Sequence, residues 1–293
     1  MHHYTGRWFA AFLLALLSMP LAAANRMFKT PEAAMQAFGD AVTRSDEAAL
    51  KAMLGDNFRQ MIPTVDAEAR QRFLAAWAQG RAIQRENGRA RIAVGTDGWS
   101  LPIPLARSSS GWSFDTQAGL DEMRIRRIGR NEVAAVQTML AIHDAQLDYA
   151  SEPRDRDGLV TYSSRLSSSP GQHDGLYWPT QPGEPPSPLG PAVASAATRN
   201  TSPDGHYGYR YKILTSQGPN AAGGARDYLV GGKLLGGFAV IAWPARYRDT
   251  GVMSFIVNQD GQVYESDLGA DTAAKAAAMK SFDPGLEWRR VSP

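Results

Sequence analysis

The chain has 293 residues, of which 43% are hydrophobic and 20% charged, a composition typical of globular proteins at a length that favours two domains. Its formal net charge of +2 argues against a nucleic-acid partner, which requires a strong local excess of basic residues. The absence of cysteine excludes disulfides and thiol catalysis, so that stability must come from the core.

Residues 1–24 have the pattern of a signal peptide. The apolar run Trp8–Leu17 is shorter than the ~20 residues that span a bilayer, so cleavage is favoured over an uncleaved membrane anchor. An A-x-A site at Ala22–Ala24 predicts cleavage before Asn25. The mature protein is therefore expected in the periplasm or outside the cell, without a stable membrane anchor.

Residues 25–119 are predicted to form an N-terminal α+β domain. Apolar residues at helical spacing, with Thr30 as a candidate N-cap, predict three helices at Phe28–Arg44, Asp46–Leu54 and Ala67–Gln79. Strands are predicted to follow at Arg89–Val94, Trp99–Leu105 and Gly111–Asp115. Pro102 and Pro104 lack the N–H that a central strand needs, which makes the second of these an edge strand or an irregular segment.

The opening of this domain, TPEAAMQAFGDAVTRSDEAALKAMLGDNF, resembles the start of NTF2-like domains, in which short helices cover a strongly bent sheet. Such domains often contain a pocket. The resemblance implies a pocket that Trp99, Trp112 and Phe114 would line. The alternative is that these aromatic side chains simply fill the core, which aromatic residues commonly dominate.

Residues 120–293 are predicted to form a second α+β domain that begins with an amphipathic helix at Arg130–Ser151. Leu120–Ser151 is either one helix or two helices that meet near Gly129. A broad apolar stripe along it should lie on a sheet and includes Val133, Val136, Met139, Leu140, Ile142, Leu147 and Tyr149. His143, on the same helix, is interpreted as structural because a catalytic base needs partners around it.

Four arginines lie near the start of this helix, and their interpretation is a solvated, salt-bridged face: Arg124, Arg126, Arg127 and Arg130. Contact with anionic lipid or with a partner is the alternative. Asp155 and Asp157, just beyond the helix, are spaced like the first ligands of a calcium loop. Leu159 and Leu166 stand where further oxygen ligands are needed, so they remain weak candidates, and no metal or cofactor is predicted.

Ser167–Pro191 is a long connection rich in proline, glycine and serine. It contains DGLYWP at 174–179 and GEPPSPLGP at 183–191. A long aromatic loop of this kind is either packed across the domain or a binding surface, and the sequence leaves both possibilities open. Candidate binding residues here are Asp174, Tyr177, Trp178 and Glu184.

Strands dominate the rest of the chain. Tyr207, Tyr209 and Tyr211 alternate with other residues, which predicts a half-exposed strand with a tyrosine face, a further candidate binding surface. Phe238–Trp243 is a continuous apolar run and hence a central strand. Hairpin turns are predicted at Gly231-Gly232 and Asp260-Gly261, and a short helix at Asp271–Lys280.

Several segments resemble the DUF2950 family of exported bacterial proteins, which is named for its unknown function: DGLYWP, GEPPSPLGP, YKILTSQGP, GFAVIAWPARY and GVMSFIVNQDGQVYESDLG. The family pattern has a histidine directly before the glycine of the tyrosine strand. Here Tyr207 precedes Gly208, and His206 lies one residue earlier. This departure argues against a catalytic role for His206.

The second half is also similar to the globular part of type IV pilin-like and pseudopilin proteins, through NEVAAVQTMLAIHDAQLDYAS, GYRYKILT and FAVIAWPARYRDTGVMSFIVNQDGQVY. The resemblance implies a helix packed on an antiparallel sheet of about four strands. The membrane-embedded half-helix of pilins is missing, so a filament role does not follow.

The sequence favours a non-enzymatic binding or interaction protein, whose partner is an unidentified protein or envelope ligand. It has no G-x-S-x-G, no P-loop and no dinucleotide fingerprint, and its remaining histidines lack ligand spacing: His143, His173 and His206. The alternatives are an envelope hydrolase or small-molecule binder that uses a pocket in the N-terminal domain, and an accessory component of a secretion or pilus-like system.

Overall fold

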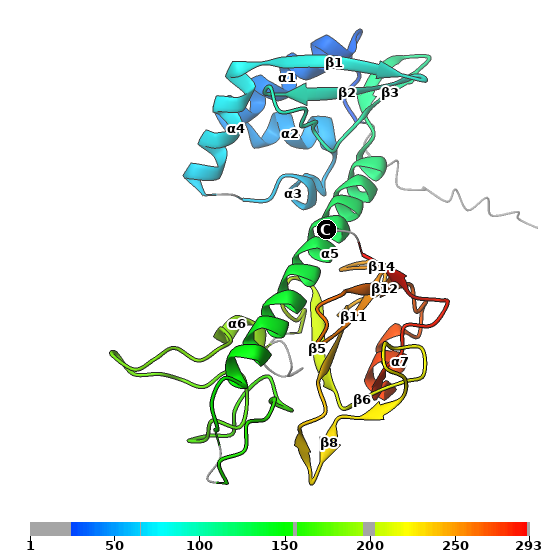
Figure 1. Ribbon diagram of the computed structural model, residues 1–293. Coiled ribbons are helices and arrows are strands. Elements are labelled where there is room, and N and C mark those ends of the chain that lie inside the picture. Colours follow the sequence, from blue (N-terminus) through cyan, green and yellow to red (C-terminus); the bar gives the residue numbers. More distant parts are fainter. Residues whose placement is uncertain (1–24, 65, 155–156, 196–202, 292–293) are drawn as a thin grey trace, which may run out of the picture. The chain divides into compact units, whose positions relative to one another are not determined.

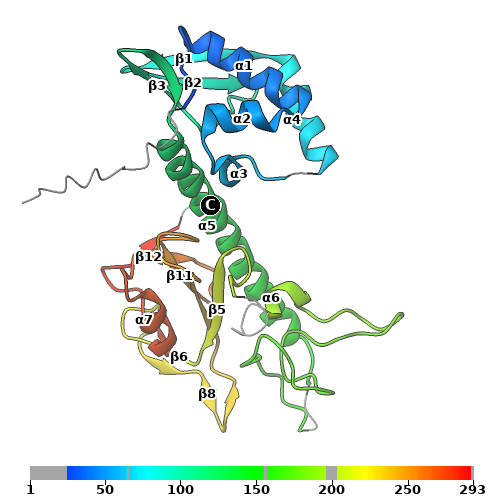
Figure 2. The ribbon, with the colours of Figure 1, turned by 180° about the vertical axis from the view of Figure 1, so that it is seen from behind.

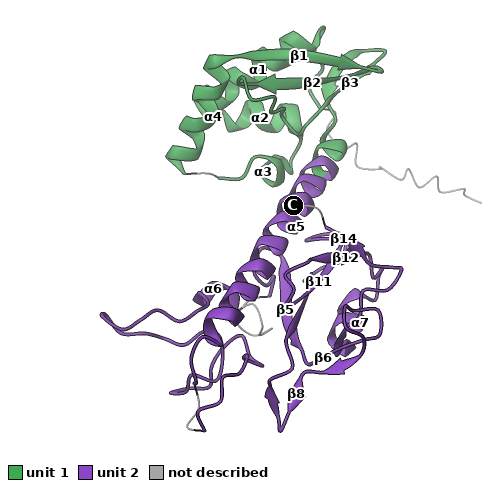
Figure 3. Cartoon of the chain, in the orientation of Figure 1, with its two compact units in different colours: residues 1–120 green, residues 121–293 purple. Residues whose placement is uncertain are grey.

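A computed structural model describes residues 25–64, 66–154, 157–195 and 203–291. Within these ranges the chain folds into seven α-helices and several antiparallel sheets, which confirms the predicted α+β class (Figure 1). The predicted signal peptide and Asp155 lie outside the described residues. The chain divides into two compact units, Met1–Leu120 and Asp121–Pro293, coloured separately in Figure 3.

Unit 1 begins with four helices: α1 (Pro31–Arg44), α2 (Glu47–Leu54), α3 (Phe58–Met61) and α4 (Ala67–Gln79). The Thr30 side chain accepts a hydrogen bond from the Ala33 N–H, and Pro31 is the first helical residue, so the predicted start of α1 is confirmed. An antiparallel sheet in the order β1-β2-β3-β4 follows: β1 (Arg81–Glu86), β2 (Arg89–Val94), β3 (Leu105–Ser108) and β4 (Gly111–Phe114).

The segment before β3 is irregular, which is one of the two alternatives predicted for Trp99–Leu105. Regular pairing begins only at Leu105, and before it a single bridge joins Ser100 to Ala93. Two prolines in this stretch remove backbone donors, which accounts for the irregular course.

The core of unit 1 is aromatic. The Phe114 ring is buried and lies 5.7 Å from the Phe38 ring, which in turn lies 6.1 Å from the Trp77 ring. Trp112 exchanges backbone hydrogen bonds with Phe28, while Trp99 is 45% exposed at the edge of the cluster. Phe114 therefore fills the core, as the alternative to a pocket predicted.

Unit 2 is built on the helix α5 (Thr116–Tyr149), a single helix that begins earlier than the predicted Arg130. It packs on an antiparallel sheet with the strand order β14-β12-β11-β10-β5. The strands are β5 (Tyr209–Leu214), β10 (Ala239–Pro244), β11 (Ser254–Asn258), β12 (Tyr264–Ser266) and β14 (Arg289–Arg290). All six residues of β10 are buried between β5 and β11, which confirms the predicted central strand.

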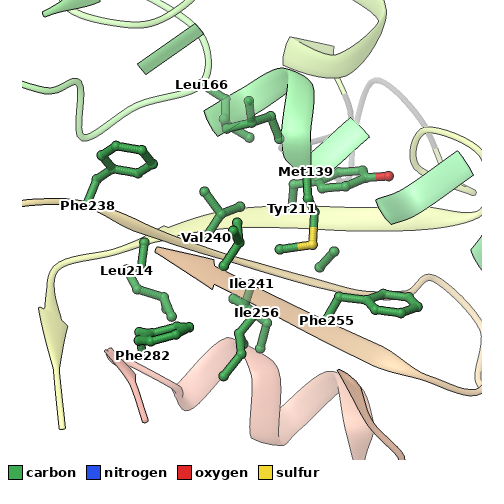
Figure 4. Close-up of a cluster of buried hydrophobic side chains, with 14 of the residues drawn as sticks. Met139, Leu166, Tyr211, Leu214, Phe238, Val240, Ile241, Phe255, Ile256 and Phe282 are labelled. Carbon is green, nitrogen blue, oxygen red and sulfur yellow. The ribbon is translucent and has the colours of Figure 1, made fainter. Parts of the chain in front are cut away.

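The sheet of unit 2 is covered on both faces. Figures 1 and 2, which view the chain from opposite sides, show α5 along one face and α7 (Thr272–Ala278) at the other. Lys212 on β5 donates from Nζ to the carbonyl oxygens of Ala276 and Met279 at the C-terminal end of α7. Close packing of apolar side chains from both sides makes this the main core (Figure 4). Burying each such side chain stabilises the fold by roughly 1.5–3 kcal/mol.

Smaller elements complete the unit: α6 (Pro191–Ser195), β6 (Ser216–Gln217), β7 (Arg226–Asp227), β8 (Leu229–Val230), β9 (Lys233–Leu234) and β13 (Ser281–Phe282). Both predicted hairpins are confirmed. Gly231 and Gly232 join β8 to β9 with positive φ values of 60° and 83°, which suits a tight two-residue turn. Asp260-Gly261 lies between the paired strands β11 and β12. Within the described residues, none of the helices has the length and apolar composition that crossing a membrane requires.

Candidate functional site

The long connection after α5 is anchored to that helix by a buried glutamine. Gln146 is fully buried, and its side-chain amide donates to the Ser163 carbonyl at 2.7 Å and accepts from the Ser163 N–H at 2.8 Å. Leu166, Leu176 and Leu189 then place apolar side chains in the core. The connection is therefore packed across the unit, which is one of the two possibilities left open by the sequence.

Asp174 organises the tight turn that carries the aromatic segment. Its carboxylate accepts hydrogen bonds from the Ser169 N–H at 2.6 Å and the Ser169 hydroxyl at 2.8 Å, and lies 3.4 Å from Arg165. Burial acts to raise the pKa of Asp174, but the hydrogen bonds from Ser169 and the charge of Arg165 outweigh it and hold the pKa below its usual value. Asp174 therefore shapes the loop from within.

Gly175, next in the turn, allows two backbone segments to approach closely. A Cβ at this position would lie 2.4 Å from backbone atoms of Ser167 and Ser168. The close approach lets the Ser168 N–H donate to the Tyr177 carbonyl, and the Tyr177 N–H donate to the Leu166 carbonyl. These bonds fix the direction in which Tyr177 and Trp178 leave the turn.

Trp178 is held by residues that precede it in the chain. Its ring stacks on the His173 ring, with centroids 4.3 Å apart and planes 20° apart. The Arg154 guanidinium lies 5.5 Å from the Trp178 ring and 5.5 Å from the Tyr149 ring. The Tyr149 hydroxyl donates to the His173 carbonyl at 2.8 Å, which ties this arrangement to the end of α5. The rings therefore form a preorganised support.

A groove of about 350 Å³ opens beside this support, and hereafter it is called the proline groove. Its lining residues carry no charged side chain: Tyr177, Trp178, Pro179, Thr180, Pro186, Ser187, Leu189, Gly190 and Pro191. The groove lies within one unit and combines two aromatic rings with three prolines. It thus unites Tyr177 and Trp178 from the predicted set.

Glu184 does not line the proline groove. It is exposed, and its carboxylate accepts a hydrogen bond from the Gln181 N–H at 2.8 Å, which closes a local turn. Its structural role is therefore confined to the shape of the loop between Pro179 and Pro186.

The tyrosine strand has a different role from the loop. Tyr209 and Tyr211 are buried, at 0% and 2% exposure, on the face of β5 that α5 covers. The Tyr209 hydroxyl donates to the Met253 carbonyl at 2.8 Å, and burial raises the pKa values of both tyrosines. The sequence placed them on a binding surface, but these side chains belong to the core because α5 covers the face of β5 on which they lie.

Tyr207 is the exposed member of the predicted tyrosine set. It is 58% exposed with φ at 51°, and its ring lies 4.3 Å from the His206 ring. Burial lowers the pKa of His206. The lining of the proline groove does not include Tyr207.

The other polar candidates are engaged in structural contacts. His143 lies 3.2 Å from the Gln259 carbonyl through Nε2 and 3.0 Å from the Asp144 carboxylate through Nδ1. Asp157 pairs with Lys233, whose hydrogen bond holds the pKa of Asp157 below its usual value. Among the described residues no group of three or more acidic or histidine side chains is arranged to hold a metal ion.

Unit 1 contains a hollow of about 460 Å³ whose lining includes none of the aromatic residues that the NTF2-like resemblance pointed to. It is lined by Asn25, Arg26, Ala48, Lys51, Ala52, Gly55 and Asp56. Lys51 and Asp56 form an ion pair across 2.9 Å within it.

The sequence did not predict the residues that hold the loop and Trp178 in place: Gln146, Arg154 and His173. One signal was present, since Gln146 is a polar residue on the face of the helix that also presents Ile142 and Tyr149. A glutamine in such a position must find hydrogen-bond partners when it is buried. The distant partner, Ser163, could not be identified from spacing alone.

These features describe an α+β protein whose candidate site is a loop-borne groove supported by a helix-on-sheet core. A family model described as "Protein of unknown function (DUF2950)" matches residues 25–291. The chain belongs to this family, which confirms the resemblance noted in the sequence. No curated protein and no solved structure matches the chain, so the NTF2-like and pilin-like resemblances gain no support, and the sheet has five strands where about four were expected.

Proposed function

We propose that this protein is an exported, non-enzymatic binding module whose proline groove holds an uncharged, extended peptide segment of a partner. The observation that carries the proposal is the groove itself, with two aromatic rings and three prolines among its lining residues and no charged side chain. Its volume of about 350 Å³ suits a few residues of a ligand rather than a large cofactor.

The chemistry of the lining supports an apolar, extended ligand. Aromatic grooves bind polyproline-type segments because these segments are already extended and lose little conformational entropy on binding. The prolines of the groove are themselves stiff, which lowers the entropy lost by the protein. A charged ligand group would give up hydration without gaining a partner among the lining residues.

The rigid support beneath the groove adds to this argument. Trp178 is stacked on His173, and the Asp174 turn fixes where Tyr177 leaves the loop. Side chains that are already ordered do not have to be immobilised when a ligand binds. The groove is thus preorganised for recognition.

Export is proposed from the sequence pattern at residues 1–24. N-terminal sequencing of the protein recovered from fractionated producing cells tests it. A periplasmic or secreted protein that begins at Asn25 is expected. Recovery of a chain that still begins at Met1 would overturn export by cleavage.

The binding proposal is tested with a panel of uncharged peptides, including a proline decamer, by isothermal titration calorimetry. A Cβ built at Gly190, a lining residue, meets nothing within 4 Å, so Gly190→Phe can be introduced into the groove without a clash at the backbone. At least one peptide is expected to bind. Gly190→Phe and Tyr177→Ala should each raise its dissociation constant at least tenfold, a loss of about 1.4 kcal/mol of binding free energy.

Glu184→Gln is the matched control, because Glu184 lies on the same loop but outside the groove. It should leave peptide affinity unchanged. Peptides that bind equally to the wild-type protein and to Gly190→Phe, or a panel in which none binds, would rule out the groove as the recognition site.

A further inference from the structure

The outer face of α5 carries large apolar side chains that the fold of unit 2 leaves uncovered. These side chains, hereafter the α5 stripe, are Ile125 (61% exposed), Val133 (61%), Leu140 (38%) and Leu147 (47%). Val133, Leu140 and Leu147 follow one another at seven-residue intervals, which places them on one side of the helix. The opposite side is buried on the sheet through Ala135, Met139, Ile142 and Ala145.

Charge changes sign along the same helix. Its first half carries four arginines and three acidic residues: Arg124, Arg126, Arg127 and Arg130, with Asp121, Glu122 and Glu132. Three of the arginines form ion pairs within the chain, Arg124 with Asp121, Arg126 with Glu122 and Arg127 with Asp249. Its second half carries Asp144 and Asp148, and Glu152 follows the helix end. Arg130 is exposed, and the Asp144 side chain is 80% exposed although it also contacts His143. The helix is therefore complementary to a reversed copy of itself.

We propose that a second copy of this chain covers the α5 stripe by packing its own α5 in antiparallel orientation, with the twofold axis at Gln137. Arg130 and Asp144 are equidistant from Gln137, so Arg130 of one copy meets Asp144 of the other. Arg126 and Asp148 are equidistant from it as well. Arg126 already pairs with Glu122 at 2.8 Å, so it would join a network that includes this contact.

The apolar residues satisfy the same register. Val133 and Leu140 lie nearly symmetrically about Gln137, so that Val133 of one copy packs beside Leu140 of the other. Ile125 and Leu147 are related in nearly the same way. One axis thus pairs all four residues of the stripe. The contact from Ile125 to Leu147 runs for about 33 Å at a rise of 1.5 Å per residue.

A parallel pairing of two copies is disfavoured by the same charges. It would place Arg130 beside Arg130 and Asp144 beside Asp144, and like charges in contact repel. In the antiparallel pairing Arg130 and Arg126 each face an aspartate of the other copy, Asp144 and Asp148. The apolar spacing alone is compatible with both directions, so the charge gradient decides the direction.

Sedimentation velocity on the purified protein over a range of concentrations tests the pairing. A dimer is expected for the wild-type chain. Leu140→Asp should raise the dissociation constant at least tenfold, whereas the control Leu286→Asp should not, because Leu286 is fully exposed and lies outside α5. A protein that stays monomeric at every concentration, or a dimer that Leu140→Asp leaves intact, would overturn the proposal.

Charge exchange tests the direction. Arg130→Asp and Asp144→Arg should each weaken the dimer, and the double variant should restore it. These residues are fourteen positions apart, about 21 Å along one helix, so restoration can only arise between copies. Circular dichroism checks that each variant is folded, and failure of the double variant to restore the dimer would refute this register.

Crosslinking gives an independent measurement because the chain has no cysteine. Gln137→Cys should form a disulfide-linked dimer on oxidation, since the axis brings the two positions together. Leu147→Cys should not, because its two copies would lie about 30 Å apart at 1.5 Å per residue. Crosslinking of Leu147→Cys in place of Gln137→Cys would overturn the antiparallel register.

Discussion

The strand β5 and the loop at 174–191 are both rich in aromatic residues, yet unit 2 uses them in opposite ways. On β5, Tyr209 and Tyr211 enter the core beneath α5 and direct their hydroxyls to backbone carbonyls. In the loop, Tyr177 and Trp178 line the proline groove. The difference arises because alternate side chains of a strand point to one face, and α5 covers that face of β5. A proline-rich loop lacks the N–H groups for regular sheet hydrogen bonding, so part of its surface stays open.

The largest expected effect separates the two regions by stability. Tyr209→Ala should lower the free energy of unfolding by about 3–5 kcal/mol, because it leaves a cavity in a fully buried site. Tyr177→Ala should lower it by less than about 1 kcal/mol, because its side chain is only partly buried. Urea denaturation, monitored by circular dichroism, measures both changes. Equal losses of unfolding free energy would mean that the loop tyrosine is as important to the core as the strand tyrosine.

The next effect concerns the anchor of the loop. Gln146→Leu removes both hydrogen bonds to the Ser163 backbone and leaves two buried polar groups unpaired, at about 1–3 kcal/mol each. Native-state hydrogen exchange should become faster across residues 163–178. The amides of β10 should lose protection only to the extent that global stability falls. Uniform loss of protection in both regions would mean that the loop and the sheet unfold together.

Acid should destabilise the loop around Asp174, whereas alkali should destabilise the packing of β5. The pKa of Asp174 is depressed in the folded protein, so its stabilising contribution is present above the unfolded pKa of about 3.9 and is lost as pH falls through the folded value. Protection factors at residues 165–177, measured relative to the intrinsic exchange rate at each pH, should therefore fall in acid. Asp174→Asn should abolish this fall, and at neutral pH it should cost about 1 kcal/mol.

The tyrosines of β5 should respond to alkali. Burial raises the pKa values of Tyr209 and Tyr211, so their contribution is present below the unfolded pKa of about 10 and is lost as pH rises above it. The alkaline loss of stability should be smaller in Tyr209→Phe, which has no group to ionise at that position. An unchanged alkaline transition in that variant would contradict the assignment.

The smallest effect is expected at Glu184. Glu184→Gln changes an exposed residue whose carboxylate bonds only to a local turn in the interactions described, so stability should change by less than about 0.5 kcal/mol. Thermal denaturation measures the change. A loss comparable to that of Asp174→Asn would mean that the tip of the loop is more strongly ordered than its contacts indicate.

The sequence predicted those features that depend on local patterns. The Thr30 N-cap of α1, the central strand at Ala239–Pro244 and both glycine-containing hairpins follow from spacing and turn chemistry. The burial of Tyr209 and Tyr211 could not be predicted in the same way. Alternation shows that a strand has two unlike faces, but it does not show which face a distant helix covers.

The groove was predictable in part. Tyr177 and Trp178 could be selected because aromatic residues stand beside prolines in a long loop. The support beneath them joins residues from α5, the end of that helix and the loop, such as Tyr149, Arg154 and His173. Contacts of this kind depend on how the chain returns to the helix, and local spacing does not specify that return.

The glycines of the loop impose unequal limits on how its sequence can diverge. At Gly175 any side chain would collide with the backbone of Ser167 and Ser168, so the position is closed to substitution as long as the turn persists. At Gly190 a Cβ meets nothing within 4 Å, and this residue lines the proline groove. Under the proposed function, substitutions at Gly190 would alter ligand preference, whereas Gly175 would keep the turn unchanged. Relatives with different ligands should differ at the position of Gly190 and keep glycine at the position of Gly175.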